Sequence, residues 1–298
     1  MPEVEETIPK SDSDMLNPLH DVLRDKKITK VREFGHLRHI WFESIHSTKE
    51  DTMTKKKSFK ALVSIFIITA LLFSAFFIYT EDYYRADYKG VEVFAAASDV
   101  TVKTIDESTM IFSVPDAKAG FIFYSGGKVE HTAYIPLMKA CASKGITCIL
   151  VKMPFNLAVF NVNAADGLKE HCPEIKNWYI GGHSLGGSMA AAHLSENAGN
   201  YKGLILLGSY STADISQSKI DVLSVYGSED KILNKEKYNE YLTCLPEDFT
   251  EIIIDGGCHA YFGMYSAQDG DGTPTITNTE QIEKTARIIE NFCIKKHP

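Results

Sequence analysis

An apolar run of nineteen residues, none of them charged, divides this chain into parts of different character. Residues 61–79 read ALVSIFIITALLFSAFFIY. At about 1.5 Å per residue, a helix of this length covers about 28 Å, close to the hydrocarbon thickness of a bilayer. A buried core helix or a cleaved signal peptide would also contain an apolar run, but this one is long and no A-x-A-like cleavage site follows it. We therefore expect a transmembrane helix over residues 61–79.

The charges on either side of the run predict its orientation. Four lysines precede it and two acidic residues follow it: Lys55, Lys56, Lys57, Lys60, Glu81 and Asp82. Positive charge collects on the cytoplasmic side of membrane proteins. We therefore expect a signal-anchor that crosses the cell membrane once, with the N-terminus in the cytoplasm and residues 81–298 outside.

Residues 1–60 are polar and charge-mixed, with 12 Lys+Arg against 11 Asp+Glu. Their weak patterning favours a poorly ordered cytoplasmic tail. Within them, Met53 begins the stretch MTKKKSFKALV, which has the basic and apolar order of a signal sequence. One hypothesis is that the functional protein starts at Met53.

The part of the chain after the run is acidic. Residues 81–298 carry 19 Lys+Arg against 28 Asp+Glu. A surface of this sign repels phosphate backbones, so nucleic acid is not an expected partner. The hydrophobic content of the whole chain, 44%, is normal for a globular protein.

All six cysteines follow the apolar run: Cys141, Cys148, Cys172, Cys244, Cys258 and Cys293. In a domain outside the membrane, an even number permits up to three disulfides, whose pairing the sequence does not reveal. Buried free thiols are the other interpretation, since Cys148 lies in an apolar strand and free cysteine is often buried. No Cys/His spacing indicates a metal site.

Short apolar runs alternate with segments of helical spacing along the rest of the chain. Buried strands are expected in GFIFYSGG, ITCILVKMP, NWYIGGHS, GLILLGS, DVLSVYGSED and TEIIIDGGCH. Helices are expected over residues 133–143, 164–171, 189–197 and 280–293. This alternation predicts an α/β domain, with a mostly parallel sheet covered by helices on both faces. Residues 90–113 alternate like exposed strands and would form an antiparallel edge, so we expect residues 81–298 to be one domain.

A G-x-S-x-G sequence, residues 182–186, lies where an apolar strand meets a helix of small residues. At such a junction the chain turns sharply and lifts the serine hydroxyl clear of the sheet, and the flanking glycines avoid collisions with neighbouring backbone. The helix N-terminus also favours developing negative charge. We therefore expect Ser184 to be a nucleophile, with His183 pointing away from it. A structural glycine-rich turn is the alternative.

Two further strand ends carry residues that could activate this serine. Asp230 follows the strand of DVLSVYG after a tight turn, and His259 follows the last strand. A buried carboxylate can orient a histidine and stabilise its charged form. Because functional groups gather at the carboxyl ends of parallel strands, we expect Ser184, Asp230 and His259 to form a catalytic triad. Glu229 is the alternative acid.

The loop after the first buried strand predicts an oxyanion-binding site. An acyl-transfer enzyme needs one backbone N–H from the residue after the nucleophile and a second from such an earlier loop. Leu185 supplies the first, and Gly127 is expected to supply the second, with Lys128 as the alternative. A plain Gly-Gly turn would explain the same residues.

These stretches resemble the α/β-hydrolase superfamily, and more narrowly the small α/β-hydrolase family 5, which is related to dienelactone-hydrolase-like proteins. The resemblance is carried by YSGGKVEHTAYIPL, GGHSLGGSMAA, VLSVYGSEDKI and GGCHAYFGMYSAQDGDG, all beyond residue 120. It implies the α/β-hydrolase fold, with Ser184, Asp230 and His259 in the chain order of nucleophile, acid and histidine. It also implies that Leu185 and Gly127 match the oxyanion positions. Dienelactone hydrolases use a cysteine where this chain has Ser184, so their substrate does not follow.

The predicted function is a membrane-anchored serine hydrolase that cleaves carboxylic esters through an acyl-enzyme. Only residues 209–220 separate GLILLGS from DVLSVYG, too few for a helical cap domain, so an open site is expected. A small-molecule or acyl substrate would be required, but no metal or organic cofactor. Two alternatives are an acyl or peptidyl transferase or peptidase acting on cell-envelope material, and an inactive binding domain displayed on the membrane.

Overall fold

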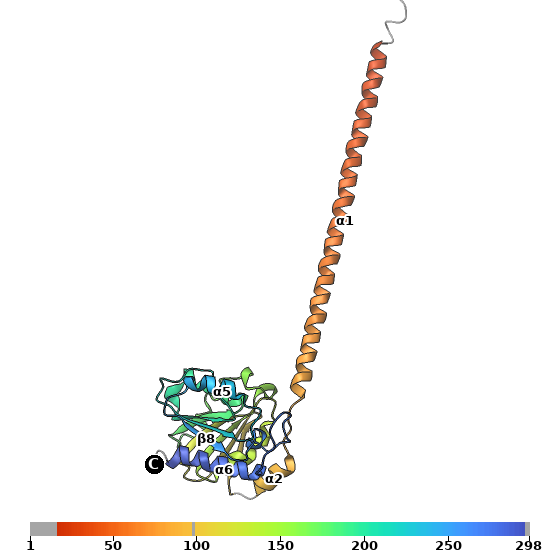
Figure 1. Ribbon diagram of the computed structural model, residues 1–298. Coiled ribbons are helices and arrows are strands. Elements are labelled where there is room, and N and C mark those ends of the chain that lie inside the picture. The colour runs from red at the N-terminus through yellow and green to blue at the C-terminus, as the bar shows by residue number, and fades with distance from the viewer. Residues whose placement is uncertain (1–16, 97–98, 296–298) are drawn as a thin grey trace, which may run out of the picture. The chain divides into compact units, whose positions relative to one another are not determined.

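The computed structural model describes residues 17–96 and 99–295 (Figure 1). The chain divides into two compact units, Met1–Ala75 and Phe76–Pro298. Helix α1 (Asn17–Glu81) makes up the described part of the first unit, and its last residues belong to the second.

Helix α1 is longer than the helix expected over residues 61–79. It extends for 65 residues and includes residues 17–60, which we expected to be poorly ordered; residues 1–16 of the expected tail lie outside the described residues. Its sequence contains one proline, Pro18 in the first turn, and one glycine, Gly35, so little in it opposes a continuous helix. Residues 17–60 have mixed charges and no regular apolar spacing, so apolar periodicity does not predict this part of the helix.

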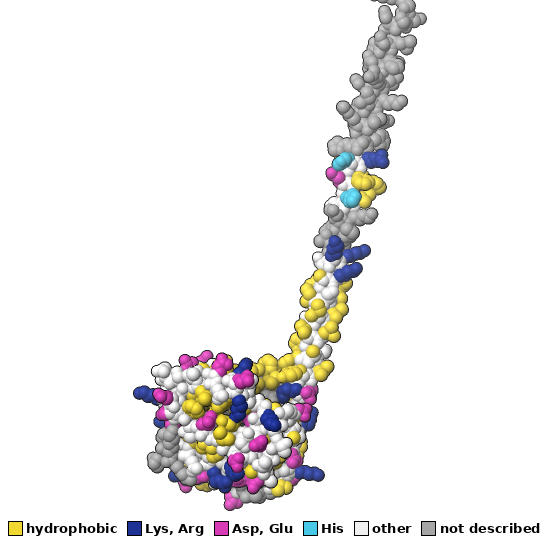
Figure 2. Space-filling model, viewed as in Figure 1, with side chains coloured by type: hydrophobic (Ala, Val, Ile, Leu, Met, Phe, Trp, Pro, Cys, Tyr) yellow, Lys and Arg dark blue, Asp and Glu magenta, His cyan; other side chains and the backbone are white. Residues whose placement is uncertain are grey.

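One stretch of α1, Lys55–Glu81, is long and apolar enough to cross a membrane. It has 27 residues, and none of its apolar window is buried inside the molecule. Figure 2 shows the hydrophobic side chains along this stretch, with lysines before them. An exposed helix of this length and composition is suited to a lipid environment, in agreement with the expected membrane span.

The second unit is built on one sheet of eight strands in the order β1-β2-β4-β3-β5-β6-β7-β8. The strands are β1 (Thr101–Asp106), β2 (Thr109–Ser113), β3 (Ala119–Tyr124), β4 (Ile146–Val151), β5 (Trp178–His183), β6 (Gly203–Leu207), β7 (Asp221–Gly227) and β8 (Thr250–Ile254). Strand β2 pairs antiparallel with β1 and β4, and all other neighbours pair in parallel. The predicted sheet, mostly parallel with an antiparallel edge, is confirmed.

Helices cover both faces of the sheet. They are α2 (Tyr88–Ala96), α3 (Ile135–Ala142), α4 (Leu185–Glu196), α5 (Lys235–Tyr241) and α6 (Asn278–Glu290). Side chains alternate across β3: Phe121 and Phe123 belong to a hydrophobic cluster with α3 and α6. Ile122 and Tyr124 belong to a second cluster with α4 on the opposite face. The period of two in a buried strand thus divides the core into two layers.

The segment before the sheet differs from the expectation of strands from residue 90 to 113. Its first part is α2, and only the later part forms strands β1 and β2. Val91 and Val93 alternate like strand residues, but Val93 is exposed and Val91 is buried beside the half-buried Phe94. Packing at a spacing of three residues therefore favours a helix here.

Several connections form short helical turns. The 3-10 turns are η1 (His131–Tyr134), η2 (Pro154–Asn156), η3 (Ala158–Phe160), η4 (Leu168–His171), η5 (Ala198–Asn200), η6 (Leu242–Cys244) and η7 (Ala260–Phe262), and a π-helical turn, η8 (Asn291–Lys295), continues α6. The helix expected over residues 164–171 is limited to η4, because Gly167 precedes it with φ of 72° and interrupts a regular helix.

All six cysteines are free, and all except Cys244 are buried. The interpretation as buried thiols therefore describes the structure, and the disulfide interpretation does not. Burial raises the pKa of the Cys258 thiol to about 12 and raises that of Cys172, so these thiols are poor nucleophiles.

Candidate active site

The predicted site residues lie at the carboxyl ends of β3, β5, β7 and β8. Strand β3 lies between β4 and β5, so the strand order reverses direction at β3. In open parallel sheets, a crevice suited to ligands forms outside the strand ends at such a switch point. The segment between β6 and β7, all of it described, contains no helix or strand. The prediction of a fold without a cap domain is thus confirmed.

Ser184 occupies a sharp turn between β5 and α4. Its backbone angles, φ 51° and ψ −123°, are rare for a residue with a side chain. Two glycines make the turn possible. A Cβ on Gly182 would lie 2.4 Å from the carbonyl oxygen of Tyr124, and one on Gly186 would lie 2.3 Å from the same oxygen. The local structure is the strained strand-to-helix turn that the G-x-S-x-G spacing predicts.

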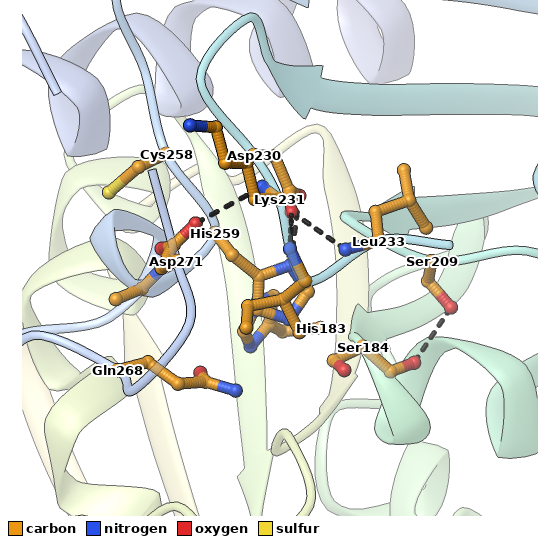
Figure 3. A network of polar contacts seen from close by, with 12 residues as sticks. His183, Ser184, Ser209, Asp230, Lys231, Leu233, Cys258, His259, Gln268 and Asp271 are labelled. Atoms are coloured by element: carbon orange, nitrogen blue, oxygen red, sulfur yellow. Dashed lines mark hydrogen bonds and ion pairs between the residues drawn. The ribbon is translucent and has the colours of Figure 1, made fainter. Parts of the chain in front are cut away.

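The backbone of Ser184 is held on both sides. Its N–H donates to the carbonyl oxygen of Leu207 at 2.9 Å, and its own carbonyl oxygen accepts from the Ser209 hydroxyl at 2.7 Å (Figure 3). The Ser188 hydroxyl lies 3.2 Å from that of Ser209 and donates to the carbonyl oxygen of Tyr210 at 2.7 Å. These contacts offset the strain of the turn and fix where the Ser184 side chain starts. No sequence motif identified Ser188 or Ser209.

Asp230 and His259 form a buried pair. Asp230 Oδ2 lies 2.8 Å from His259 Nδ1, and both side chains are shielded from solvent (Figure 3). The other carboxylate oxygen accepts from the backbone N–H groups of Leu233 at 2.8 Å and Ile232 at 3.0 Å. The alternative acid, Glu229, instead accepts from the Ser228 hydroxyl. The structure therefore joins Asp230, and not Glu229, to the histidine.

Ser184 and His259 line the same cavity, of about 240 Å³, between α4 and the loops after β6 and β7. Within the described residues, Nε2 of His259 is buried and has no hydrogen-bond partner. The structure thus links Asp230 to His259 by a hydrogen bond and Ser184 to His259 by the cavity that they share. A histidine with one nitrogen held by a carboxylate and the other unpartnered can accept a proton.

Gly127 lies beside the first residue of α4. A Cβ on Gly127 would be 2.9 Å from Leu185 Cδ2, so the two residues are in contact range. The N–H of Leu185 belongs to the first turn of α4, where backbone donors have no partner within the helix. The backbone N–H of Lys128 donates to the carbonyl oxygen of Asn156 at 2.8 Å. Lys128 is therefore occupied, which leaves Leu185 and Gly127 as the candidate oxyanion donors.

His183 lies against the pair formed by Asp230 and His259, although it was not predicted to be part of the site. Its ring centroid is 4.4 Å from that of His259, and its Nδ1 lies 2.8 Å from the Tyr134 hydroxyl. That hydroxyl also accepts from the N–H of Gly126 at 3.1 Å. Burial, followed by the nearby His259, lowers the pKa of His183 well below its ordinary value. A neutral His183 adds no second positive charge when His259 takes up a proton.

Two more polar residues hold the loop that carries His259. The side-chain amide of Gln281 on α6 donates to the carbonyl oxygen of Cys258 at 2.8 Å and accepts from the Cys258 N–H at 3.0 Å. Asp271 accepts from the N–H of Ala260 at 2.9 Å and from that of Lys231 at 3.3 Å, so it connects the histidine loop to the Asp230 loop. Neither residue was predicted from the sequence, although the Asp-Gly repeat around Asp271 indicates a turn.

No group of three or more His, Cys, Asp or Glu side chains suitable for a metal ion is found in the part of the chain that the structure describes. The polar groups at the site are a hydroxyl, an imidazole, a carboxylate and backbone N–H donors. Such a set can attack a carbonyl, move a proton and hold an oxyanion.

A family model described as "Alpha/beta hydrolase family" matches residues 120–283, more than half of the chain. No curated protein matches the sequence. Among solved structures, Est1E from Butyrivibrio proteoclasticus is similar over 66% of this chain and 100% of its own, with 14% identity and a TM-score of 0.47. TT1662 from Thermus thermophilus is similar over 66% of this chain and 99% of its own, with 12% identity and a TM-score of 0.51. The likeness to TT1662 is one of fold.

Proposed function

Because the chain belongs to the alpha/beta hydrolase family, we propose that it is a serine hydrolase that cleaves carboxylic esters through an acyl-enzyme. The observation that supports this most is the buried hydrogen bond between Asp230 and His259, next to a cavity lined by both His259 and Ser184. The strained backbone turn at Ser184 supports the same role, because such a turn presents the serine hydroxyl clear of the sheet.

In the proposed mechanism, the Ser184 hydroxyl attacks the ester carbonyl while His259 Nε2 takes the hydroxyl proton. Asp230 orients His259 and stabilises its charged form. The carbonyl oxygen becomes an oxyanion, held by the N–H groups of Leu185 and Gly127. His259 then gives the proton to the leaving alcohol, and a water molecule, activated by His259, hydrolyses the acyl-enzyme to release the acid.

The size of the cavity supports a small reacting group. Its volume of about 240 Å³ is less than the range of roughly 300–1,000 Å³ for pockets that enclose drug-sized ligands. With no cap between β6 and β7, the cavity would hold the scissile carbonyl and its nearest atoms, while the rest of a larger substrate lies outside.

Labelling by a fluorophosphonate probe tests this function in the full chain. We expect the wild type to be labelled and to hydrolyse p-nitrophenyl butyrate, and Ser184→Ala to lose both. Ser195→Ala is the matched control, because Ser195 is exposed on the same helix. Unchanged turnover by Ser184→Ala would show that this serine is not the nucleophile.

We propose that the hydrolase unit lies outside the cytoplasm and that the chain crosses the membrane once. The support is the charge distribution around Lys55–Glu81: lysines before its apolar part and acidic residues after it. Protease added to intact cells should therefore degrade the hydrolase unit, whereas lysis should be required before residues near the N-terminus are cut. Protection of the hydrolase unit in intact cells would reverse the orientation.

A further inference from the structure

Three large apolar side chains are exposed in the loop after β4. Phe155, Val159 and Phe160 are 45%, 47% and 50% exposed, and we refer to them as the aromatic loop. They belong to an uncharged stretch, residues 153–165. A cluster of exposed apolar residues on an otherwise charged surface marks a site of contact.

The aromatic loop contacts the end of the apolar part of α1, within the compact unit that begins at Phe76. The Phe76 ring packs edge-on against Phe155 at 5.1 Å and against Phe160 at 5.7 Å between centroids. Phe77 packs on Phe155 at 6.3 Å. Phe76 and Phe77 are among the last residues of the apolar run, residues 61–79.

The residues that follow have the chemistry of a membrane–water boundary. The ammonium group of Lys128 lies 4.4 Å from the centre of the Tyr79 ring and 2.9 Å from a carboxylate oxygen of Asp82. Tyrosine and lysine favour this boundary because each has an apolar body and a polar tip. Phe76 therefore lies just inside the boundary when Lys55–Glu81 spans a bilayer, and residues that touch Phe76 share its depth.

The backbone of the aromatic loop is held in an unfavourable conformation. Phe155 and Asn156 both have φ of 54°, in the left-handed region that residues with side chains seldom adopt. The N–H of Lys128 donates to the carbonyl oxygen of Asn156 and holds this turn. Strained residues of this kind are concentrated at functional sites, and here the strain displays Phe155 next to the loop that carries Gly127.

We propose that the aromatic loop rests in the interfacial layer of the lipid bilayer that α1 spans. Continuity with the end of the apolar run selects lipid as the occupant, because the same rings that touch the aromatic loop must themselves lie in lipid. This surface does not depend on the proposed esterase activity. Combined with that activity, it means that the substrates are amphiphilic esters that reach the catalytic cavity from the bilayer surface.

Tryptophan quenching by brominated lipid tests the surface without any catalytic readout. The full chain with Trp41→Phe would be reconstituted in phosphatidylcholine vesicles brominated near the headgroup end of the acyl chains. Trp178 is buried and remains as a constant background. We expect Phe160→Trp to add fluorescence that these lipids quench. Ile253→Trp, a matched control at an exposed apolar position on β8, should not be quenched.

A positive control within the span makes each outcome decisive. Phe66→Trp, in the apolar run, should be quenched in the same vesicles and thereby show that α1 has inserted. With that control satisfied, quenching of Phe160→Trp by iodide in the water and not by lipid overturns the proposal. Protection of Phe160→Trp from both quenchers also overturns it, and would instead indicate cover by a second copy or another protein.

A second measurement tests the consequence for substrates. In Val159→Asp/Phe160→Asp, the ratio of turnover of a vesicle-embedded ester to turnover of a water-soluble ester should fall about tenfold, because charged residues leave the interfacial layer. If this ratio equals that of the wild type while lipid still quenches Phe160→Trp, the aromatic loop contacts lipid but the inference of amphiphilic substrates is wrong. Loss of turnover of both esters in Ser184→Ala belongs to the proposed function and is read separately.

Discussion

The turns that follow β4 and β5 lie on either side of β3. They share an unusual backbone conformation but differ in what surrounds it. Each contains a non-glycine residue at positive φ: Ser184 after β5, and Phe155 after β4. The Ser184 turn is packed against strand backbone by glycines, and its backbone is hydrogen-bonded to Leu207 and to the Ser209 hydroxyl. The Phe155 turn is exposed and held by backbone hydrogen bonds: Lys128 N–H to Asn156, Asn156 N–H to Met153 and Leu157 N–H to Pro154. Strain in the first turn places Ser184 at the wall of a cavity, whereas strain in the second displays an apolar ring on the surface.

The largest expected effect tests whether the first turn is catalytic. Asp230→Asn should lower kcat for p-nitrophenyl butyrate about 10⁴-fold, because an amide can hold His259 in the wrong tautomer and cannot stabilise its charged form. Glu229→Gln is the control, since Glu229 contacts Ser228 and not the histidine. Steady-state kinetics on the two purified variants makes the comparison. An equal loss of kcat in both variants would show that Asp230 is not the residue that orients His259.

The next effect tests the close packing that distinguishes the first turn. Gly186→Ala places a Cβ 2.3 Å from the carbonyl oxygens of Ser125 and Tyr124. We expect the free energy of unfolding to fall by about 3 kcal/mol, since the backbone must shift to make room. Gly199→Ala is the control, because nothing lies within 4 Å of the added atom. Urea unfolding monitored by circular dichroism would measure both, and equal stabilities would show that the turn is loosely packed.

The difference between the two turns also explains what the sequence could predict. The Ser184 turn has a compact signature, G-x-S-x-G between a strand and a helix, in which steric necessity dictates residue type. The Phe155 turn has no such signature. Nothing in its sequence, PFNL, indicates that Phe155 and Asn156 adopt positive φ. Its significance depends on contact with Phe76, which lies far away in the chain.

The same reasoning applies to the residues that support the site. Strand ends predicted Asp230 and His259, because parallel strands bring their carboxyl ends to one edge of the sheet. Gln281 was missed, since its bonds to Cys258 depend on how α6 packs against the sheet. The segment that forms α2 was predicted to be a strand. A short apolar alternation is compatible with the period of a strand and with that of a helix, and packing decides between them.

A pH-dependent effect tests the buried environment behind Ser184. Burial lowers the pKa of His183 in the folded chain below its unfolded value of about 6.5. The unfolded chain therefore binds more protons below that pH, so the contribution of neutral His183 to stability is fully present above pH of about 6.5 and is lost as pH falls. Because His183→Gln removes this proton uptake, the loss of stability on acidification should be smaller by up to about 1.4 kcal/mol per pH unit.

Unfolding free energies measured between neutral and mildly acidic pH provide this test. His131 and His193 also have lowered pKa values caused by burial, and they remain in both proteins. Only the difference in slope between wild type and His183→Gln therefore reports on His183. Identical slopes would mean that His183 keeps its ordinary proton affinity in the folded chain, and that the ring beside His259 can carry charge.

The last test compares the strain of the two turns directly, through a difference of about 1 kcal/mol between them. At each position, the alanine and glycine variants both lack the native side chain, so their difference in stability reports mainly the cost of a Cβ at positive φ, apart from the greater freedom of glycine when unfolded. At Phe155, with φ 54° and ψ 23°, Phe155→Gly should exceed Phe155→Ala in stability by about 1 kcal/mol. The pair Ser184→Gly and Ser184→Ala should differ by more, about 2 kcal/mol, because φ 51° with ψ −123° lies in a region even less open to a Cβ. Thermal unfolding of the four variants in the same detergent would measure both differences. A larger difference at Phe155 than at Ser184 would reverse the comparison, making the exposed aromatic turn the more strained of the two.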